Sequence, residues 1–316
     1  MMRCLVTGGA GFIGSHLTDR LVFDGHEVTV FDNLSTGLES NLESVRARIR
    51  FINGDLRDLE IVRDAVNNQE LVFHLGALGS VPRSIDDPIT TNAVNVNGTL
   101  NILVSSKDAG VKRIIYASSS SVYGDTSVLP KVETMPLRPL SPYALSKVTA
   151  EEYCRVFHAV YGLETVSLRY FNVFGPRQRP DSQYAAVIPR FVTALIQGHA
   201  PTVHGDGLQS RDFTFVQNNV VANILAATAP SKNVAGKVFN IACDGQHSLL
   251  ELIDLINTLI GSNVKPIFVA SRAGDVRDSR ANIREAQNAI GYIPEVSFAT
   301  GMAKTINAFK AQLSTF

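Results

Sequence analysis

The sequence predicts an α/β fold, in which a doubly wound parallel sheet is followed by a smaller C-terminal α/β unit. Two observations support this prediction. Short apolar runs alternate with amphipathic segments through the first half of the chain, and this alternation builds a parallel sheet covered by helices on both faces. The first apolar run, residues 4–6, leads into a glycine-rich turn at residues 7–14 and then into an amphipathic segment that ends near Gly25. A strand, a glycine turn and a helix in this order are typical of a nucleotide-binding unit.

The glycine turn carries the most specific signal. Residues 9, 11 and 14 are glycines in the spacing Gly-x-Gly-x-x-Gly, and Gly8 adds an overlapping pattern. One glycine permits the tight turn, one lets a pyrophosphate approach backbone N–H groups, and one lets the helix pack on the strand. The positive end of the helix dipole then faces the phosphates. The turn therefore predicts a Rossmann-type dinucleotide-binding domain.

The end of the second predicted strand indicates which dinucleotide is bound. This strand, residues 27–31, is followed by Asp32, which lies 18 residues after Gly14. That spacing is close to the value of about 20 expected for the acid that binds the adenosine ribose. Because a carboxylate repels a 2′-phosphate, the sequence favours NAD over NADP.

Length, charge and cysteine content limit the other possibilities. At 316 residues the chain exceeds one average domain, which agrees with one large unit and a smaller one. Its 29 basic and 29 acidic residues leave no basic field for nucleic acid or anionic lipid, and no apolar run approaches the roughly 20 residues of a membrane span. Cys4, Cys154 and Cys243 are too far apart in sequence for a disulfide framework or a zinc site. We therefore expect a cytoplasmic protein with no metal, no nucleic-acid partner and no membrane partner.

The remaining elements of the large unit follow in order. A polar loop at residues 33–37 is placed to close over the adenosine half of the cofactor, and a third strand covers residues 50–53. Asp55 follows it, and the sequence leaves two roles open: contact with the adenine edge, or a helix cap. The fourth strand, residues 71–75, runs into small residues that let a ligand lie against the backbone. We expect His74 in this strand to pack beside the sheet. A helix at residues 91–109, ended by Gly110, and a fifth strand at residues 113–117 complete the pattern.

A serine run and a later helix start carry the candidate chemistry. Four serines, residues 118–121, follow the fifth strand, and Ser141 with Pro142 has the pattern of a capped helix N-terminus. Tyr143 and Lys147 then share one helix face, four residues apart. On their own they would more simply be surface residues of a helix, but they come after a dinucleotide fingerprint and a serine-rich strand end.

Their chemistry suits proton transfer beside a nicotinamide. A phenol with a pKa near 10 is a poor base at neutral pH. A nearby lysine ammonium and an oxidised nicotinamide would favour the phenolate and bring Tyr143 into working range. Lys147 can also hold the ribose hydroxyls, and a serine from the strand end can hydrogen-bond the same substrate oxygen. The sequence thus predicts that serine, tyrosine and lysine act as one unit.

Together these residues resemble the extended short-chain dehydrogenase/reductases and, within them, the UDP-sugar 4-epimerases, over essentially the whole chain. Segments 32–34, 95–99, 168–172 and 211–213 also resemble epimerase segments. The resemblance implies that Ser119, Tyr143 and Lys147 are catalytic. It implies NAD contacts from Gly8, Gly11, Phe12, Ile13, Asp32, Asn33, Ser35, Thr36, Gly37, Asp55, Leu56, Leu75, Ala77, Tyr143, Lys147 and Phe171. It implies UDP-sugar contacts from Ser80, Ser119, Ser120, Asn172, Gln178, Val187, Arg211, Arg272, Asp275 and Ser279.

The resemblance also bears on which sugar is bound. Ser279 stands at the family's gate position beside the hexose, and a serine leaves room for an N-acetyl group that a tyrosine would crowd. Segments 79–84 and 178–189 are similar to epimerases that prefer UDP-N-acetylglucosamine and UDP-N-acetylgalactosamine, with Ser80 and Gln178 near the acetamido group. A UDP-glucose 4-epimerase without this preference stays open. A 4,6-dehydratase would need an acid in the serine run, and an NAD sensor would not need Tyr143 and Lys147.

Two residues depart from the family pattern, and the resemblance sets the domain limits. Gly76 replaces a usual alanine, and Val94 stands where some members have a cofactor-contacting asparagine.

We expect an NAD-binding domain at residues 1–171 with a returning segment near 211–245, and a mainly UDP-sugar-binding domain at 172–316. There, residues 204–207 form a turn and residues 248–260 a helix. The helices near 91–109 and 142–161 are expected to pair with their copies in a homodimer.

Overall fold

The computed structural model describes residues 1–179, 186–270 and 276–313. Within this part of the chain, seven parallel strands form one sheet in the order β11-β6-β5-β4-β1-β2-β3. The strands are β1 (Arg3–Thr7), β2 (Glu27–Asp32), β3 (Ile49–Asn53), β4 (Leu71–His74), β5 (Arg113–Ser119), β6 (Glu164–Tyr170) and β11 (Lys237–Ile241). The central strands are buried on both faces, mostly by apolar side chains, as in a sheet covered on both sides. The doubly wound parallel sheet predicted from the sequence is confirmed.

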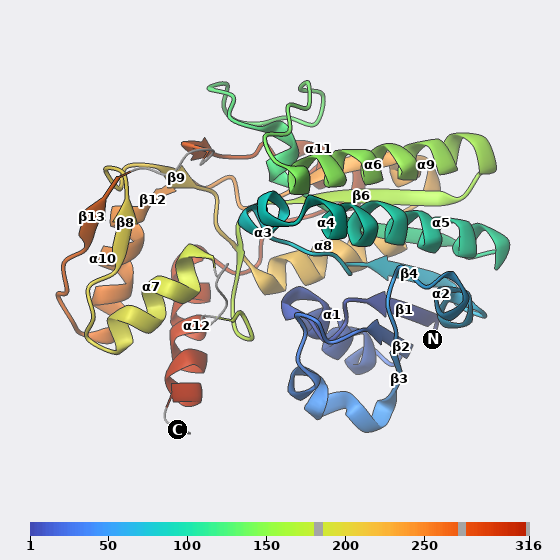
Figure 1. The fold of residues 1–316 in the computed structure, drawn as a ribbon, viewed down its shortest axis with the longest axis horizontal. Helices are drawn as coiled ribbons and strands as arrows, with labels where there is room; N and C mark the ends of the chain where they lie inside the picture. Colours follow the sequence, from blue (N-terminus) through green and yellow to red (C-terminus); the bar gives the residue numbers. More distant parts are fainter. Residues whose placement is uncertain (180–185, 271–275, 314–316) are drawn as a thin grey trace.

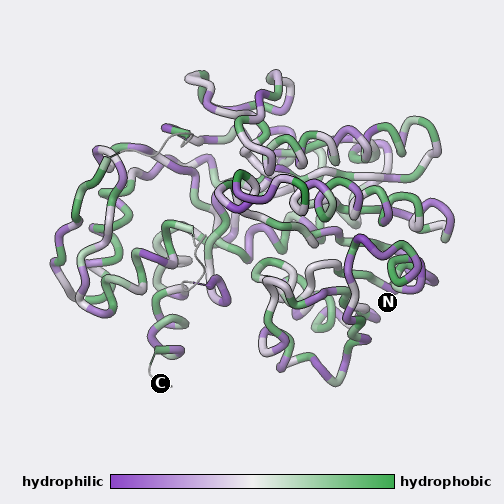
Figure 2. The backbone as a smooth tube through the Cα atoms, viewed as in Figure 1, coloured by the Kyte–Doolittle hydropathy of each residue, from purple (hydrophilic) through white to green (hydrophobic). Residues whose placement is uncertain are grey.

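Helices cover both faces of this sheet, as Figure 1 shows. One face packs against α1 (Phe12–Phe23), η1 (Glu39–Arg48) and α8 (Val216–Thr228), which share a core with the strands. The other face packs against α2 (Leu59–Val66), α5 (Gly98–Asp108) and α6 (Pro142–Tyr161). In Figure 2 hydrophobic and hydrophilic segments alternate along these outer helices, the pattern of helices with one face on a core. None of the described helices is long and apolar enough to cross a bilayer.

The helix ends follow local sequence signals. The Ser141 hydroxyl accepts the backbone N–H of Ala144 at 3.1 Å, and Pro142 takes the first helical position of α6, as predicted. The helix predicted at residues 91–109 is instead three consecutive segments: α4 (Pro88–Asn92), a π-helical turn η2 (Ala93–Asn97) and α5. The other short elements of the large unit are α3 (Val81–Asp86) and η3 (Ser120–Tyr123).

A second unit lies beside the sheet, at the left of Figure 1. Its core lies between α7 (Val187–Ile196), α10 (Leu249–Ile260) and α12 (Phe298–Leu313). As predicted, α10 begins after Ser248, which forms a capping box with Glu251. Short strands complete the unit: β8 (Thr202–His204) pairs with β13 (Ile267–Val269), and β9 (Ser210–Arg211) pairs with β12 (His247–Ser248) and β14 (Asp278–Ser279).

The chain crosses between the two units more than once. It leaves the sheet at β7 (Val173–Phe174), which pairs with β10 (Thr214–Phe215), and it returns through α8, α9 (Ser231–Val234) and β11. A second return was not predicted. Residues 281–292, including α11 (Arg284–Ile290), place Ala281, Ile283 and Tyr292 in the core of the large unit. The domain limits at residue 171 and near 211–245 stay a prediction.

Candidate active site

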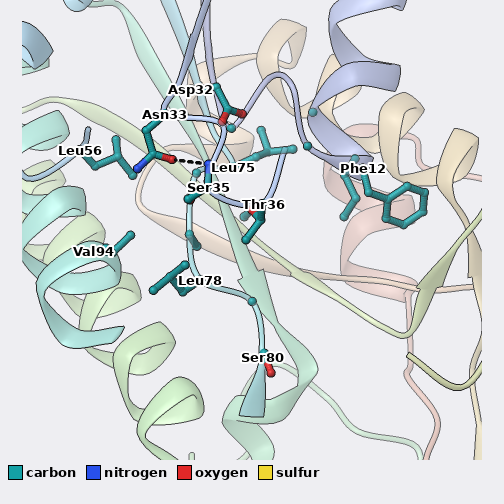
Figure 3. Close-up of a pocket in the computed structure, with 18 of the residues that line it drawn as sticks. Phe12, Asp32, Asn33, Ser35, Thr36, Leu56, Leu75, Leu78, Ser80 and Val94 are labelled. Carbon is teal, nitrogen blue, oxygen red and sulfur yellow. Dashed lines mark hydrogen bonds between the residues drawn. The ribbon is translucent and has the colours of Figure 1, made fainter. Parts of the chain in front are cut away.

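A cavity of about 410 Å³ opens at the carboxyl ends of the central strands. It lies where the strand order reverses, with β2 on one side of β1 and β4 on the other, which is the usual ligand site of a doubly wound sheet. In Figure 3, Asp32 and Ser80 lie toward opposite ends of the labelled residues, with Leu78 between them. The cavity therefore extends from the end of β2 to the segment that follows β4.

The glycine turn forms one wall of this cavity. Gly8 has a φ of +68°, and its N–H donates to the Phe31 carbonyl at 2.8 Å, which ties the turn to β2. Gly11 is the N-cap of α1 and offers no capping side chain, and the first turn of α1 contains no acidic residue. The N–H groups of that turn thus face the cavity without a competing carboxylate. These residues fit a dinucleotide pyrophosphate.

Asp32 links the turn to the loop after β2. Its carboxylate accepts the backbone N–H of Ala10 at 3.0 Å and that of Leu34 at 2.8 Å, and the side chain is almost fully buried. Burial raises the pKa of Asp32, while the two hydrogen bonds lower it. The acid thus stands at the end of β2, where an adenosine ribose would lie.

For Asp55, one of the two roles left open is excluded. The N-cap of α2 is Asp58, whose carboxylate accepts the N–H groups of Glu60 and Ile61. Asp55 instead lines the cavity and accepts hydrogen bonds from the Asn33 amide at 3.0 Å and from the Arg57 guanidinium. Arg57 holds the pKa of Asp55 well below its usual range.

Most of the residues expected to bind NAD line this one cavity. They are Gly8, Gly11, Phe12, Ile13, Asp32, Asn33, Ser35, Thr36, Asp55, Leu56, Leu75, Ala77, Tyr143 and Lys147. Gly76 and Val94, the two departures from the family pattern, line it as well. Gly37 and Phe171 do not. A Cβ on Gly37 would lie 2.9 Å from the carbonyl carbon of Ala10, and the Phe171 ring is fully buried beside Tyr123.

The structure brings the predicted catalytic residues together at the end of β5. Ser119 lies near enough to Tyr143 to lower the pKa of its phenol, and its own hydroxyl oxygen accepts the Ser121 hydroxyl at 2.9 Å. The Lys147 ammonium donates to the carbonyl of Ala117 at 2.7 Å and lies 6.0 Å from the centre of the Tyr143 ring. The serines now differ in their partners, since the Ser118 hydroxyl donates to the buried carboxylate of Glu151. Ser119 is therefore the serine that contacts the phenol.

The electrostatics of Tyr143 differ from the prediction. Burial raises the pKa of Tyr143, and only the hydrogen bond from Ser119 acts in the other direction. Burial also lowers the pKa of Lys147 to about 8, with Glu151 opposing it. Burial therefore sets the direction of the Tyr143 pKa shift, and Lys147 is not among the groups that lower this pKa. Of the two positive groups predicted to favour the phenolate, the lysine ammonium and the oxidised nicotinamide, only the nicotinamide then remains.

The residues expected to bind the UDP-sugar are more dispersed. Ser80 lines the cavity, caps α3 and accepts the N–H of Arg83 at 3.3 Å. Arg211 and Ser279 are direct neighbours in the pairing of β9 with β14, although the sequence separates them widely. The described residues of this set that do not line the cavity are Ser119, Ser120, Asn172, Gln178, Val187, Arg211 and Ser279. Arg272 and Asp275 lie outside the described residues.

Two of these side chains hold the backbone near the unit boundary. The amide of Asn172 donates to the Asp212 carbonyl at 3.2 Å, and that of Gln178 donates to the Val173 carbonyl at 3.2 Å. Their amide N–H groups thus hold backbone carbonyls, whereas the side-chain oxygen of Gln178 is buried without a hydrogen-bond partner among the described residues.

Sequence reasoning missed several cavity residues, namely Asn41, Leu78, Arg83, Tyr170, Arg177 and Arg179. Arg177, whose backbone φ is +66°, also forms an ion pair with Asp19 of α1 at 2.7 Å. The signal that could have indicated this loop is the pair of arginines at 177 and 179 just after Gly175 and Pro176, where the chain leaves the sheet. His74, as expected, packs beside the sheet, where it is buried and bonded to the hydroxyls of Thr7 and Thr99.

A Rossmann-type sheet with serine, tyrosine and lysine beside its dinucleotide cavity defines a short-chain dehydrogenase/reductase of the extended type. The family model described as "NAD dependent epimerase/dehydratase family" matches residues 4–242. The chain belongs to this family, and its cofactor is NAD.

Known relatives resemble the chain over its whole length. The UDP-glucose 4-epimerase of Mycolicibacterium smegmatis is 39% identical, and the match covers 98% of this chain and 99% of the relative. The UDP-N-acetylglucosamine 4-epimerase of Methanobrevibacter ruminantium, solved with UDP-N-acetylmuramic acid, is 38% identical with a TM-score of 0.94, covering 98% of this chain and 99% of the other. The UDP-glucose 4-epimerase of Thermotoga maritima, solved with UDP-glucose, is 36% identical with a TM-score of 0.94, covering 99% and 100%.

Proposed function

We propose that the protein is an NAD-dependent epimerase that inverts carbon 4 of a UDP-hexose, with UDP-N-acetylglucosamine and UDP-N-acetylgalactosamine as its preferred substrates. The observation that carries the proposal is that Tyr143 and Lys147 both line the dinucleotide cavity, with Ser119 acting on the Tyr143 phenol from the end of β5. The 4-epimerase relatives, matched over their whole length, support the reaction type.

In this mechanism the chain's own residues move one proton and hold the sugar. NAD, when bound, supplies the acceptor and then the donor of the hydride at carbon 4. Tyr143 takes the proton of the 4-hydroxyl as the hydride leaves with its electron pair, and the sugar becomes a 4-keto sugar. Ser119 hydrogen-bonds the same oxygen. After the sugar turns over, hydride returns to the opposite face and Tyr143 gives the proton back, so no net oxidation occurs.

Binding through the UDP group allows this turn without loss of the intermediate, because its contacts are remote from carbon 4. Arg211 is the described arginine proposed to hold the pyrophosphate, since its fork suits phosphate oxygens. It is held in place through its guanidinium, which donates to the carbonyls of Ser210 and Arg277 at 2.8 Å each.

The preference for an acetylated sugar rests on Ser279. This small residue lies in register with Arg211 and is buried, so the proposed pyrophosphate and hexose positions are adjacent. The alternative is a UDP-glucose 4-epimerase without N-acetyl preference. Incubating the protein separately with UDP-N-acetylglucosamine and UDP-glucose, and following the 4-epimers by chromatography, decides between them. Fast turnover of the plain sugar alone would overturn the role of Ser279.

Among the described residues, the serine run has no free acid for the rival 4,6-dehydratase reaction. A 4,6-dehydratase needs an acid near the serine run to expel the 6-hydroxyl. The carboxylate found there, Glu151, is buried and receives two guanidinium nitrogens of Arg169.

The variant Tyr143→Phe tests the reaction class. It should lose at least about 100-fold in turnover because the proton has no acceptor, whereas Tyr153→Phe on the same helix should behave as the wild type. Unchanged turnover of Tyr143→Phe would defeat the mechanism.

We also propose that two copies associate through the outer side of α4 and α6. Apolar side chains gather there although they face solvent, with Ile89 82% and Leu145 55% exposed, alongside Leu140 and Val160. Burying this face against a second copy would form a two-fold helical interface. Leu145→Glu should yield monomers in light scattering, while Leu208→Glu, an exposed leucine elsewhere, should not. A monomeric wild type would refute this proposal.

A further inference from the structure

Helix α6 and the end of strand β5 are joined by two hydrogen bonds and by a neighbouring contact between Ser119 and Tyr143. Residues 117, 118 and 119 of β5 each contact a different residue of α6, and the three α6 residues are spaced by four. Ala117 offers its carbonyl to Lys147, the Ser118 hydroxyl donates to Glu151, and Ser119 contacts Tyr143. Since residues at i, i+4 and i+8 lie along one helix face, the register of the strand end depends on all three contacts.

The third of these α6 residues, Glu151, has no assigned role in the proposed reaction. Its side chain is 6% exposed, and its carboxylate accepts hydrogen bonds from the Arg169 guanidinium at 2.8 and 3.0 Å. The same guanidinium also donates to the Tyr123 hydroxyl at 2.8 Å, so Arg169 has partners besides this carboxylate. A buried ion pair of this kind is weak evidence of a role in stability alone, because desolvation offsets much of its attraction.

Few other charges act on Lys147. On β4, His74 is kept neutral by burial, which lowers its pKa to about 3. On β5, the Tyr116 ring centre lies 5.0 Å from the Lys147 nitrogen, and on α6 its neighbours are Tyr143, Cys154 and Glu151. Arg169 on β6 hydrogen-bonds both oxygens of Glu151. Of the groups that raise the pKa of Lys147 against its desolvation, the Glu151 carboxylate acts most strongly.

We propose that Glu151 is a positioning residue, which keeps Lys147 as an ammonium and fixes the end of β5 so that Ser119 meets Tyr143. This inference rests on the proposed epimerase reaction. Its consequence is that Tyr143, Lys147 and Glu151 form one functional row on α6, in which the last member never touches substrate or cofactor.

The test uses the holoenzyme with three variants. Glu151→Gln removes the charge and keeps an oxygen that can accept from Ser118, Glu151→Asp is the conservative control, and Glu151→Gln with Arg169→Gln removes both buried charges together. For each we would measure the pH dependence of kcat, the pH at which bound NAD is lost on dialysis, and thermal unfolding.

In Glu151→Gln and in the double variant, the alkaline loss of kcat and the loss of NAD should both move to lower pH by roughly one to two pH units. Glu151→Asp should restore most of the wild-type profile. A double variant with wild-type profiles overturns the proposal, because Glu151 would then serve only to pair with Arg169. If the double variant does not fold, Glu151→Gln decides, and a Glu151→Gln profile equal to that of Glu151→Asp overturns the proposal. If the wild type epimerises no UDP-hexose, the proposed function fails, while the NAD measurement still tests Glu151.

Discussion

Replacing Gly14 by alanine should push helix α1 away from the glycine turn. A Cβ at residue 14 would lie 2.1 Å from the carbonyl oxygen of Gly8, 2.8 Å from its carbonyl carbon and 2.9 Å from the Cα of Gly9. All three neighbours are backbone atoms, so no side chain can rotate out of the way. The Gly8 carbonyl also accepts the N–H of Gly11 at 3.0 Å, which ties it to the start of the helix.

The cost follows from these contacts. Ordinary contact distances begin at 3.4 Å, so either the turn or the helix must move by more than 1 Å. Overpacking of this kind costs about 1–3 kcal/mol, and loss of the bond between Gly11 and Gly8 adds about 1 kcal/mol. We therefore expect Gly14→Ala to lower the free energy of unfolding by about 2–4 kcal/mol and to purify with less bound NAD.

Urea unfolding followed by circular dichroism, together with the NAD content of the purified protein, measures both effects. Gly79→Ala is the matched control, since Gly79 lines the same cavity but a Cβ there would meet nothing within 4 Å. If the free energies of unfolding of Gly14→Ala and of this control differ by less than about 0.5 kcal/mol, the close contact between turn and helix does not require a glycine at residue 14.

Two further predictions concern buried ionisable groups. Asp32→Ser removes the carboxylate at the end of β2, so we expect NAD to bind about 10- to 100-fold more weakly and the preference for NAD over NADP to decrease. Titration calorimetry with both dinucleotides measures the two affinities. An unchanged preference would show that Asp32 does not face the ribose. For His74, burial lowers the pKa from 6.5 to about 3, so below pH 6.5 the unfolded chain takes up a proton that the folded protein does not. Its contribution to stability is therefore present above pH 6.5 and lost as the pH falls toward 3, by up to about 1.4 kcal/mol per pH unit. Urea midpoints against pH should fall less steeply for His74→Gln, and parallel curves would contradict this.

The parts of the fold that could be predicted from sequence depend on neighbours along the chain. Ser141 caps α6 and Ser248 caps α10 because the cap and its N–H partners lie within three residues of each other. The strand, glycine turn and helix at the N-terminus are equally local. Even so, the sequence does not identify the cap of α2, because both Asp55 and Asp58 precede the helix and only the backbone geometry selects Asp58.

What could not be predicted depends on contacts between distant segments. Nothing in the serine run indicates that Ser118 bonds to Glu151, 33 residues later, while Ser119 faces Tyr143. Periodicity likewise does not reveal that Arg177 reaches Asp19, or that Arg211 and Ser279 pair across two short strands. The raised pKa of Tyr143 has the same origin, since it depends on how deeply the folded protein buries the ring.

The late return of residues 281–292 means that no single cut can release the large unit intact. Tyr292 is fully buried there, and its hydroxyl donates to the carbonyl of Ala242 at 2.9 Å, just past the edge strand β11. In a chain that stops after β11, the core residues that pack against Ala281, Ile283 and Tyr292 would be exposed to water. The nucleotide-binding half is therefore finished only after almost the entire polypeptide has been made, and it depends on the segment that follows directly after Ser279.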